Sequence, residues 1–220
     1  MKTIIFATGN RGKLREAQDI LGSRFSLVTP ADKGLTEEIP ETGTTLRANS
    51  LEKAQYVFDR LHTDCFSDDS GLEVDVLGGR PGVYSARYGG SDHDFNANMD
   101  RLLADMAIAL TDASMAREVG LETPMATRKA RFRTVVTLIL NGEPHYFNGS
   151  LEGSIGLVKR GTGGFGYDPV FIPDEIPAED GSLVPNTERR TLAELGEDVK
   201  NAISHRGKAV RAMAAFLHEK

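Results

Sequence analysis

Two adjacent aspartates, Asp68 and Asp69, are the residues best suited to chemistry. They follow a short apolar segment, Cys65-Phe66, and they precede Ser70-Gly71. Two carboxylates at the end of a buried strand, beside a glycine turn, can hold a hard metal ion or orient a water molecule. The alternative is an Asx turn, in which the aspartates bond nearby backbone N–H groups. Because strand side chains alternate between faces, a strand that ran through both aspartates would give them different roles.

The N-terminus has a pattern suited to binding phosphate. Lys2 to Ala7 predicts a buried strand, Thr8-Gly9-Asn10 a tight turn, and the residues from Arg11 onward a helix. Such a turn points backbone N–H groups at a ligand, the helix dipole adds partial positive charge, and Lys13 adds a full charge. The sequence contains no GxxxxGK[ST] motif, so this is not a Walker loop. A capped helix with a solvated lysine is the alternative.

A loop and a helix come next, before the aspartates. Glu41 belongs to a group of loop glutamates that could complete a metal site begun by Asp68 or Asp69, although such residues are usually just solvated. Thr44 or Thr45 can cap the following helix. Asn49 and Lys53 lie one turn apart on that helix, on a face that could be polar, and we expect Lys53 to be at the surface.

A glycine-rich loop, Gly161 to Pro169, contains the spelling GxGxxG of a dinucleotide-binding motif. We reject that interpretation, because an apolar strand pattern follows the loop and the motif needs a helix there. The flexible backbone instead allows a flat group to approach Phe165 or Tyr167 closely.

The last helix is predicted to begin after Ser204, which can cap it. His205 and Arg206 then fall in the first turn, where the helix dipole favours acids instead. A broken local rule of this kind points to an anion or hydrogen-bonding site. A surface His-Arg pair is the alternative.

The other segments supply the framework. Asn141-Gly142 predicts a hairpin turn between strands at 132–140 and 145–151. Apolar residues from Phe95 to Leu110 at helical spacing predict a core helix. We also expect a strand at 25–29, a peripheral helix or surface excursion at 111–129, a strand at 155–158, a mobile loop at 174–190 and a broken helix at 192–203.

Composition narrows the class of protein. The chain has 220 residues, 40% of them hydrophobic, and this is enough for one domain, with or without two lobes. A net charge of −6 argues against a partner that is nucleic acid. A single cysteine excludes an intramolecular disulfide and a multi-cysteine zinc site. The sequence shows no signal peptide and no apolar run of the ~18 residues that a membrane span needs, so we expect a cytoplasmic protein with no membrane partner.

Four segments together resemble one family, the inosine triphosphate pyrophosphatases of the Ham1 or RdgB type. They are Thr8 to Lys13 with Glu16, Ser67 to Leu72 through Ala86-Arg87-Tyr88, Gly163 to Pro169, and Ser204-His205-Arg206. The resemblance implies Mg²⁺-dependent hydrolysis of ITP, dITP, XTP and dXTP to the monophosphate and pyrophosphate. It also implies a homodimer and an α/β fold, with an elongated mixed sheet flanked by helices and a cleft between two lobes, in which residues 1–220 form a single domain.

The resemblance also implies a role for each site residue. Asp69 would be the general base, and Glu41 and Asp69 would be the metal ligands. The triphosphate would be bound by Thr8, Gly9, Asn10, Arg11, Gly12 and Lys13, with Lys53 facing the phosphates and Ser70 contacting the substrate. The nucleotide pocket would be lined by Phe165, Gly166, Tyr167 and Asp168, and the base would be held by Lys200, His205 and Arg206.

Two segments depart from the family pattern, since 111–129 and 174–190 are longer than usual, and the second puts the alignment of Lys200 in doubt.

Three other functions stay open. They are a house-cleaning pyrophosphatase of the Maf type, which should lack the Ser-His-Arg segment, a non-catalytic nucleotide sensor, and a serine hydrolase that uses Ser70 and His205 without a GxSxG elbow.

Overall fold

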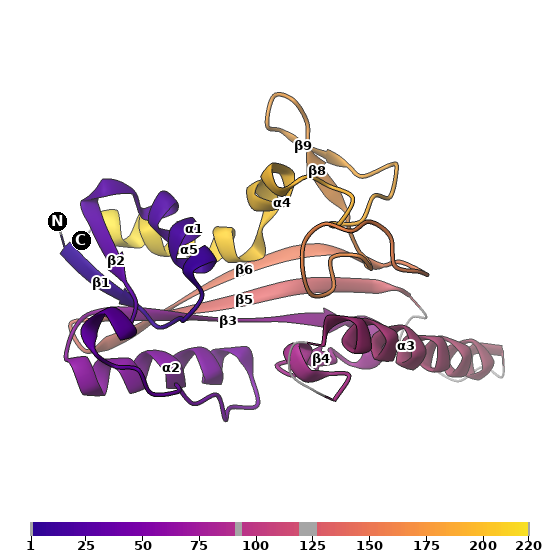
Figure 1. The fold of residues 1–220 in the computed structure, drawn as a ribbon. Helices are drawn as coiled ribbons and strands as arrows, with labels where there is room; N and C mark the ends of the chain where they lie inside the picture. Colours follow the sequence, from indigo (N-terminus) through magenta and orange to yellow (C-terminus); the bar gives the residue numbers. More distant parts are fainter. Residues whose placement is uncertain (1, 91–93, 119–126, 220) are drawn as a thin grey trace. The chain divides into compact units, whose positions relative to one another are not determined.

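The computed structural model describes residues 2–90, 94–118 and 127–219. It is a mixed α/β fold, as predicted (Figure 1). Its helices are α1 (Arg11–Leu21), α2 (Leu46–Leu61), α3 (Phe95–Glu118), α4 (Glu197–Ile203) and α5 (His205–His218). Its strands are β1 (Lys2–Phe6), β2 (Phe25–Val28), β3 (Cys65–Val74), β4 (Pro81–Gly82), β5 (Lys129–Leu140), β6 (Glu143–Ile155), β7 (Phe171–Pro173), β8 (Glu175–Pro177) and β9 (Leu183–Pro185).

The main sheet is mixed, with the strand order β2-β1-β3-β5-β6-β7 and with β4 paired to β3. β1 is parallel to both β2 and β3, whereas β3–β4 and β6–β7 are antiparallel. At the turn between β5 and β6, Asn141 and Gly142 both have positive φ, 52° and 85°. This is the backbone that a tight two-residue hairpin needs, and it is why this dipeptide predicted the turn correctly.

The chain forms two compact units. The first contains Met1–Ser70, Arg133–Ser150 and His205–Lys220, and the second contains Gly71–Phe132 and Leu151–Ser204. The single domain and the cleft that the family resemblance implies stay predictions.

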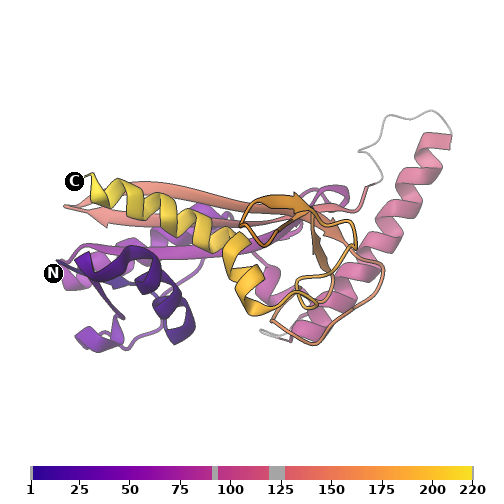
Figure 2. The same cartoon turned by 90° about the horizontal axis from the view of Figure 1, so that it is seen from above.

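In the first unit, both faces of the sheet are covered by helices. Ile4 and Phe6 pack in one cluster with residues of α1 and α5, whereas Ile5 packs on the other side with Ala54 of α2. Figures 1 and 2 show α1 and α5 on the same side of the sheet, and Figure 1 shows α2 on the opposite side. A strand buried on both faces has no polar alternation, which explains the continuous apolar run at the N-terminus.

The second unit has its own core around α3. Met99, Leu102 and Met106 of that helix are buried in one cluster with Leu72 and Phe171. The periodic apolar residues of this helix are therefore core residues, as predicted. Within the described residues, no helix combines the length and the hydrophobicity that crossing a bilayer requires.

Four sequence-based expectations about elements were wrong. β3 does not end at the aspartates but continues through them to Val74. The segment 174–190, expected to be a mobile loop, contains the two-stranded sheet of β8 and β9. The strand expected at 155–158 is absent as a separate element, since β6 reaches Ile155 and the next three residues are not in a strand. In the broken helix expected at 192–203, only α4 is helical.

In the segment 111–129, α3 extends to Glu118, which agrees with a peripheral helix, and β5 begins at Lys129. The interval 119–126 lies outside the described residues.

Candidate active site

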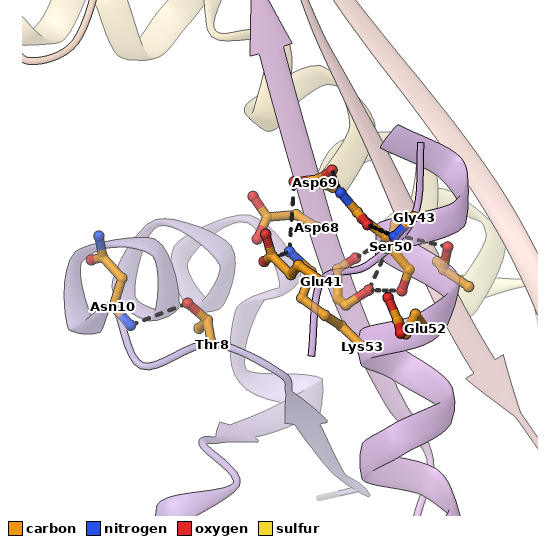
Figure 3. A network of polar contacts seen from close by, with 12 residues as sticks. Thr8, Asn10, Glu41, Gly43, Ser50, Glu52, Lys53, Asp68 and Asp69 are labelled. Carbon is orange, nitrogen blue, oxygen red and sulfur yellow. Dashed lines mark hydrogen bonds and ion pairs between the residues drawn. The ribbon is translucent and has the colours of Figure 1, made fainter. Parts of the chain in front are cut away.

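The N-terminus of α1 is built around Asn10. Its side-chain Oδ1 accepts hydrogen bonds from the N–H groups of Gly12 (2.8 Å) and Lys13 (3.2 Å), so Asn10 is the N-cap of the helix. The N–H of Asn10 in turn donates to Thr8 Oγ1 at 3.1 Å, and Figure 3 shows this pair. The N–H of Thr8 donates to the carbonyl of Phe6. The expectation that Thr8 and Asn10 present free N–H groups is therefore wrong, because both groups have acceptors within the turn and its flanks.

Side chains, rather than those backbone groups, carry the positive charge here. The Lys13 ammonium donates to both carboxylate oxygens of Asp68, at 3.1 and 2.9 Å. Arg11 lies differently, since its exposed guanidinium pairs with Asp32 at 3.0 Å. Of the two cations in this turn, Lys13 is the one that the structure brings to an aspartate of β3.

Asp68 is the buried centre of an ion-pair network in the first unit. It accepts hydrogen bonds from Lys13 and from Nε of Arg206 (2.9 Å), and Arg206 Nη1 lies 3.5 Å from Glu16. Burial by itself would raise the pKa of Asp68, but Lys13, Arg206 and Lys53 together lower it below its ordinary value. For Lys13 the effect of burial prevails: burial lowers the pKa of the ammonium, although the neighbouring Asp68 raises it. A carboxylate held ionised by two cations is a poor proton acceptor, so Asp68 is suited to organising the site.

Asp69 points away from that network, as strand alternation requires. Its Oδ2 accepts a hydrogen bond from Asn49 Nδ2 at 3.2 Å, and its Oδ1 lies 3.6 Å from the Lys53 ammonium. Burial raises the pKa of Asp69 above its ordinary value; Lys53 opposes this shift and Glu41 adds to it. A partly buried carboxylate with a raised pKa is the better candidate for a general base.

Lys53 is buried, which corrects its expected surface position. Its ammonium lies 2.5 Å from Glu41 Oε1 as well as near Asp69 (Figure 3). Burial alone would lower the pKa of Lys53, but Asp68, Asp69 and Glu41 raise it above its ordinary value. The lysine can stay charged inside the protein because carboxylates surround it.

A cavity of about 350 Å³ lies in the first unit, beside the N-terminus of α1. Its lining includes Thr8, Gly9, Lys13, Glu41, Lys53 and Asp68. Pockets of this size hold small ligands in many proteins. The structure thus brings the predicted phosphate-binding turn, both lysines and one predicted metal ligand to a single cavity.

The fit of a divalent cation can be tested on Glu41 and Asp69. Glu41 Oε1 lies 2.5 Å from the Lys53 ammonium, and Asp69 Oδ1 lies 3.6 Å from it, so the two carboxylates converge on the position of that ammonium. In the part of the chain that the structure describes, no group of three or more Asp, Glu, His and Cys side chains gathers in a way that could hold a metal ion. Mg²⁺ is typically bound by one or two carboxylates together with water and substrate phosphates, so two converging carboxylates fit it.

The second unit contains the residues predicted to line the nucleotide pocket. Phe165 is 59% exposed, and the Lys200 ammonium lies 4.1 Å from the centroid of its ring. Lys200 also pairs with Asp168, whose Oδ2 accepts a hydrogen bond from the Phe165 N–H at 2.9 Å. Despite the long preceding segment, Lys200 therefore does lie beside the glycine-rich loop.

Three other residues of this loop have structural roles. Tyr167 is buried and its hydroxyl donates to the carbonyl of Ser85 at 2.9 Å, so Phe165 is the ring available to a flat ligand. Gly164 has a φ of 78°, and a Cβ there would lie 2.1 Å from Asp168 Oδ2. Gly166 has a φ of 63°. These glycines let the loop fold over Asp168, and they do not form a dinucleotide motif.

The C-terminal pair is in the first unit. α5 begins at His205, directly after Ser204, as predicted. His205 is half-buried, and the Arg206 side chain is 13% exposed against Asp68 and Glu16. The Ser70 hydroxyl shares a hydrogen bond of 2.6 Å with Thr134 Oγ1. A threonine hydroxyl is not a general base, so this geometry gives no support to a serine nucleophile.

Two contributors were named in the sequence analysis but given no role there. Asn49 bonds Asp69, and its only signal was a position one helical turn before Lys53. Glu16 was noted within a motif, but its contact with Arg206 joins residues 190 positions apart and leaves no local pattern.

Comparison with known proteins shows which family this chain resembles over its length. The sequence profile of the Ham1 family matches residues 4–216. A protein of Porphyromonas gingivalis named dITP/XTP pyrophosphatase is 42% identical over 217 residues, which cover 99% of this chain and 98% of that protein. A protein of the same name from Bacillus subtilis is 39% identical over 219 residues, or 99% and 98% of the two chains.

Solved structures give the same result. A HAM1 protein from Coxiella burnetii superposes with a TM-score of 0.83 at 30% identity, with all of both chains covered. The nucleoside-triphosphatase, or dITP/XTP pyrophosphatase, of Mycobacterium abscessus gives a TM-score of 0.71 at 37% identity over 98% of each chain. With the profile match over nearly the whole sequence, these similarities show that the chain belongs to the Ham1 family and is a nucleoside-triphosphate pyrophosphatase.

Proposed function

We propose that the protein hydrolyses the deaminated purine nucleoside triphosphates ITP, dITP, XTP and dXTP to the monophosphate and pyrophosphate, with Mg²⁺ as its metal. The observation that carries the proposal is that four side chains gather around the aspartates of β3. The Lys13 ammonium contacts Asp68, and the Lys53 ammonium lies near both Glu41 and Asp69. Its substrate class is supported by the relatives named dITP/XTP pyrophosphatase.

In this proposal the triphosphate binds beside the N-terminus of α1. Lys13 and Lys53 border the same cavity and supply two positive charges for phosphate oxygens. Glu41 and Asp69 would hold the cation, which when bound neutralises charge on the phosphates. The ammonium groups of both lysines contact carboxylates, so the oxygens of a bound triphosphate would replace some of these contacts.

Asp69 is proposed as the general base. It orients a water molecule toward the α-phosphorus and accepts its proton as the bond to the pyrophosphate breaks. The raised pKa of Asp69 makes it a better acceptor than Asp68, whose pKa is lowered. Lys13 and Lys53 stabilise the negative charge that develops on the leaving pyrophosphate.

From the family resemblance, the nucleotide pocket is assigned to Phe165, Gly166, Tyr167 and Asp168, and the base is assigned to Lys200, His205 and Arg206. The exposed Phe165 ring offers a surface for stacking, and the ammonium of Lys200 offers a donor. Hypoxanthine and xanthine carry a 6-oxo acceptor where adenine carries an amino donor. Protein donors directed at that position would reject adenine, because its amino group would then face another donor.

The test is to incubate the protein with Mg²⁺ and, separately, ITP, XTP, GTP and ATP, and to assay pyrophosphate and orthophosphate independently. We expect pyrophosphate as the direct product and a clear preference for ITP and XTP. Direct release of orthophosphate, or equal rates with ATP, would contradict the proposal. A homodimer and a cytoplasmic location belong to the same proposal, and light scattering of the purified protein measures the first.

A further inference from the structure

The loop that carries Glu41 is held by three side chains of α2. The N–H and the hydroxyl of Thr42 donate to the two carboxylate oxygens of Glu52, at 2.7 and 2.8 Å. The N–H of Gly43 donates to Asn49 Oδ1 at 2.7 Å. With the contact between Lys53 and Glu41, three consecutive loop residues each meet a different side chain of the helix. Figure 3 shows Glu41, Gly43, Glu52 and Lys53 together.

The helix can make these contacts because of their spacing. Positions 49, 52 and 53 are related as i, i+3 and i+4, so their side chains lie on one face of α2. Both oxygens of the Glu52 carboxylate are used, and the hydrogen bonds from Thr42 lower the pKa of Glu52. The contact is therefore with the ionised form of this carboxylate.

Asn49 connects the loop to β3, the strand that carries Asp69. Its side-chain oxygen accepts from Gly43, and its NH₂ group donates to Asp69 Oδ2 at 3.2 Å. These partners fix the orientation of the amide, because an N–H must meet oxygen and a carboxylate must meet a donor. Asn49 is only 2% exposed, so one buried amide touches both the general base and the loop of the second metal ligand.

The loop also packs against the helix with no space between them. A Cβ on Gly43 would lie 2.7 Å from Ala48 Cβ and 2.7 Å from Asn49 Oδ1. Only glycine fits there, so the backbone of the loop is fixed directly against the first turn of α2.

We propose that Glu52 and Asn49 are positioning residues that hold the loop 41–43 so that the Glu41 carboxylate faces Asp69. Glu52 acts through Thr42, and Asn49 acts through Gly43 and Asp69. The Glu41 side chain is itself 41% exposed, and a loop carboxylate of this kind would otherwise sample many positions before it could bind a cation. The inference rests on the proposed function, in which Glu41 is a metal ligand.

The test combines two measurements on Glu52→Ala. In the protein without metal or nucleotide, we expect amide hydrogen exchange at Gly43 to be about tenfold faster, because the loop loses its anchor at the neighbouring Thr42. With Mg²⁺ and ITP, we expect kcat/KM to fall about tenfold. The double variant Glu41→Gln/Glu52→Ala should match Glu41→Gln alone within about twofold, because Glu52 acts only through Glu41.

The matched control is Asp59→Asn, which removes one negative charge from an exposed position of the same helix and should behave as the unmodified protein. If Glu52→Ala does not fold, Thr42→Val removes only the hydroxyl donor and should give the same effects at about threefold. The positioning role would be overturned if Glu52→Ala left either the exchange at Gly43 or kcat/KM unchanged. It would also be overturned if the losses of kcat/KM from Glu41→Gln and Glu52→Ala multiplied in the double variant. If the unmodified protein released no pyrophosphate from ITP, the proposed function itself would fail, and the positioning role with it.

Discussion

The ammonium of Lys13 donates hydrogen bonds to both carboxylate oxygens of Asp68, although 55 residues separate them in the chain. This contact ties the first turn of α1 to the middle of β3. Arg206 completes the arrangement from α5 by donating to the same carboxylate. One buried aspartate thus joins three elements of the first unit, and its neighbour Asp69 is left to face Glu41 and Lys53.

Asp68→Asn should destabilise the protein by about 3–5 kcal/mol, because it leaves the buried charges of Lys13 and Arg206 without their partner. Urea unfolding followed by circular dichroism measures the change. The control is Glu188→Gln, which breaks an exposed pair with Arg190 and should cost less than about 1 kcal/mol. A loss from Asp68→Asn as small as the control would contradict a central role for Asp68.

The loss of unfolding free energy caused by Asp68→Asn should depend on pH. The folded-state pKa of Asp68 is lowered, so its contribution to stability is fully present above its unfolded pKa of about 3.9 and is lost as the pH falls through the folded value. The stability gap between the unmodified protein and Asp68→Asn should therefore be constant near neutral pH and narrow below about pH 4. A gap that narrowed toward alkaline pH would have the wrong sign.

Asp69→Asn should reduce kcat with ITP by about 10²–10⁴-fold and leave the fold intact, because it removes the proposed base but keeps the shape of the side chain. Because burial raises the pKa of Asp69, an NMR titration of its carboxyl in the protein without metal should give a pKa above the ordinary aspartate value. Asp75→Asn, which alters a surface pair with Arg131, is the control. Near-normal turnover of Asp69→Asn would remove Asp69 from the mechanism.

The sequence predicted elements whose signals are local. The apolar run of β1, the cap at Thr45 and the hairpin at Asn141-Gly142 each depend on residues a few positions apart. Alternation along a strand also indicated correctly that Asp68 and Asp69 differ. Which of them faces Lys13 and Arg206 could not be read from the pattern, because these two residues are 55 and 138 positions away from Asp68.

The errors have the same origin. Lys53 was expected at the surface because lysine is rarely buried unless paired, and its partners Glu41 and Asp69 lie outside its own helix. The segment 174–190 has the polar, proline-containing composition of a loop. Its short strands β8 and β9 pair mainly through backbone hydrogen bonds, which the types of side chain do not reveal.

Phe165→Ala should raise KM for every purine triphosphate, because stacking of a base on an aromatic ring contributes about 1–3 kcal/mol and every base has a flat face. We expect an increase between about fivefold and 150-fold in KM, similar for ITP, XTP and ATP. Steady-state kinetics with each nucleotide measure it, and Leu183→Ala, at an exposed apolar residue of β9, is the control. An unchanged KM would show that the base does not stack on this ring.

Arg206→Ala should reduce the preference for ITP over ATP about tenfold or more, if its guanidinium is a donor to the 6-oxo group. It should also lower stability, since Arg206 pairs with Asp68 and Glu16. Arg206→Lys separates the two effects, because a lysine keeps the charge near Asp68 but not the planar donor set. The measurements are the ratio of kcat/KM for ITP and ATP and the free energy of unfolding. A ratio that stayed unchanged in both variants while stability fell would make Arg206 a partner of Asp68 alone, and selection of the base would then depend on Lys200 and His205.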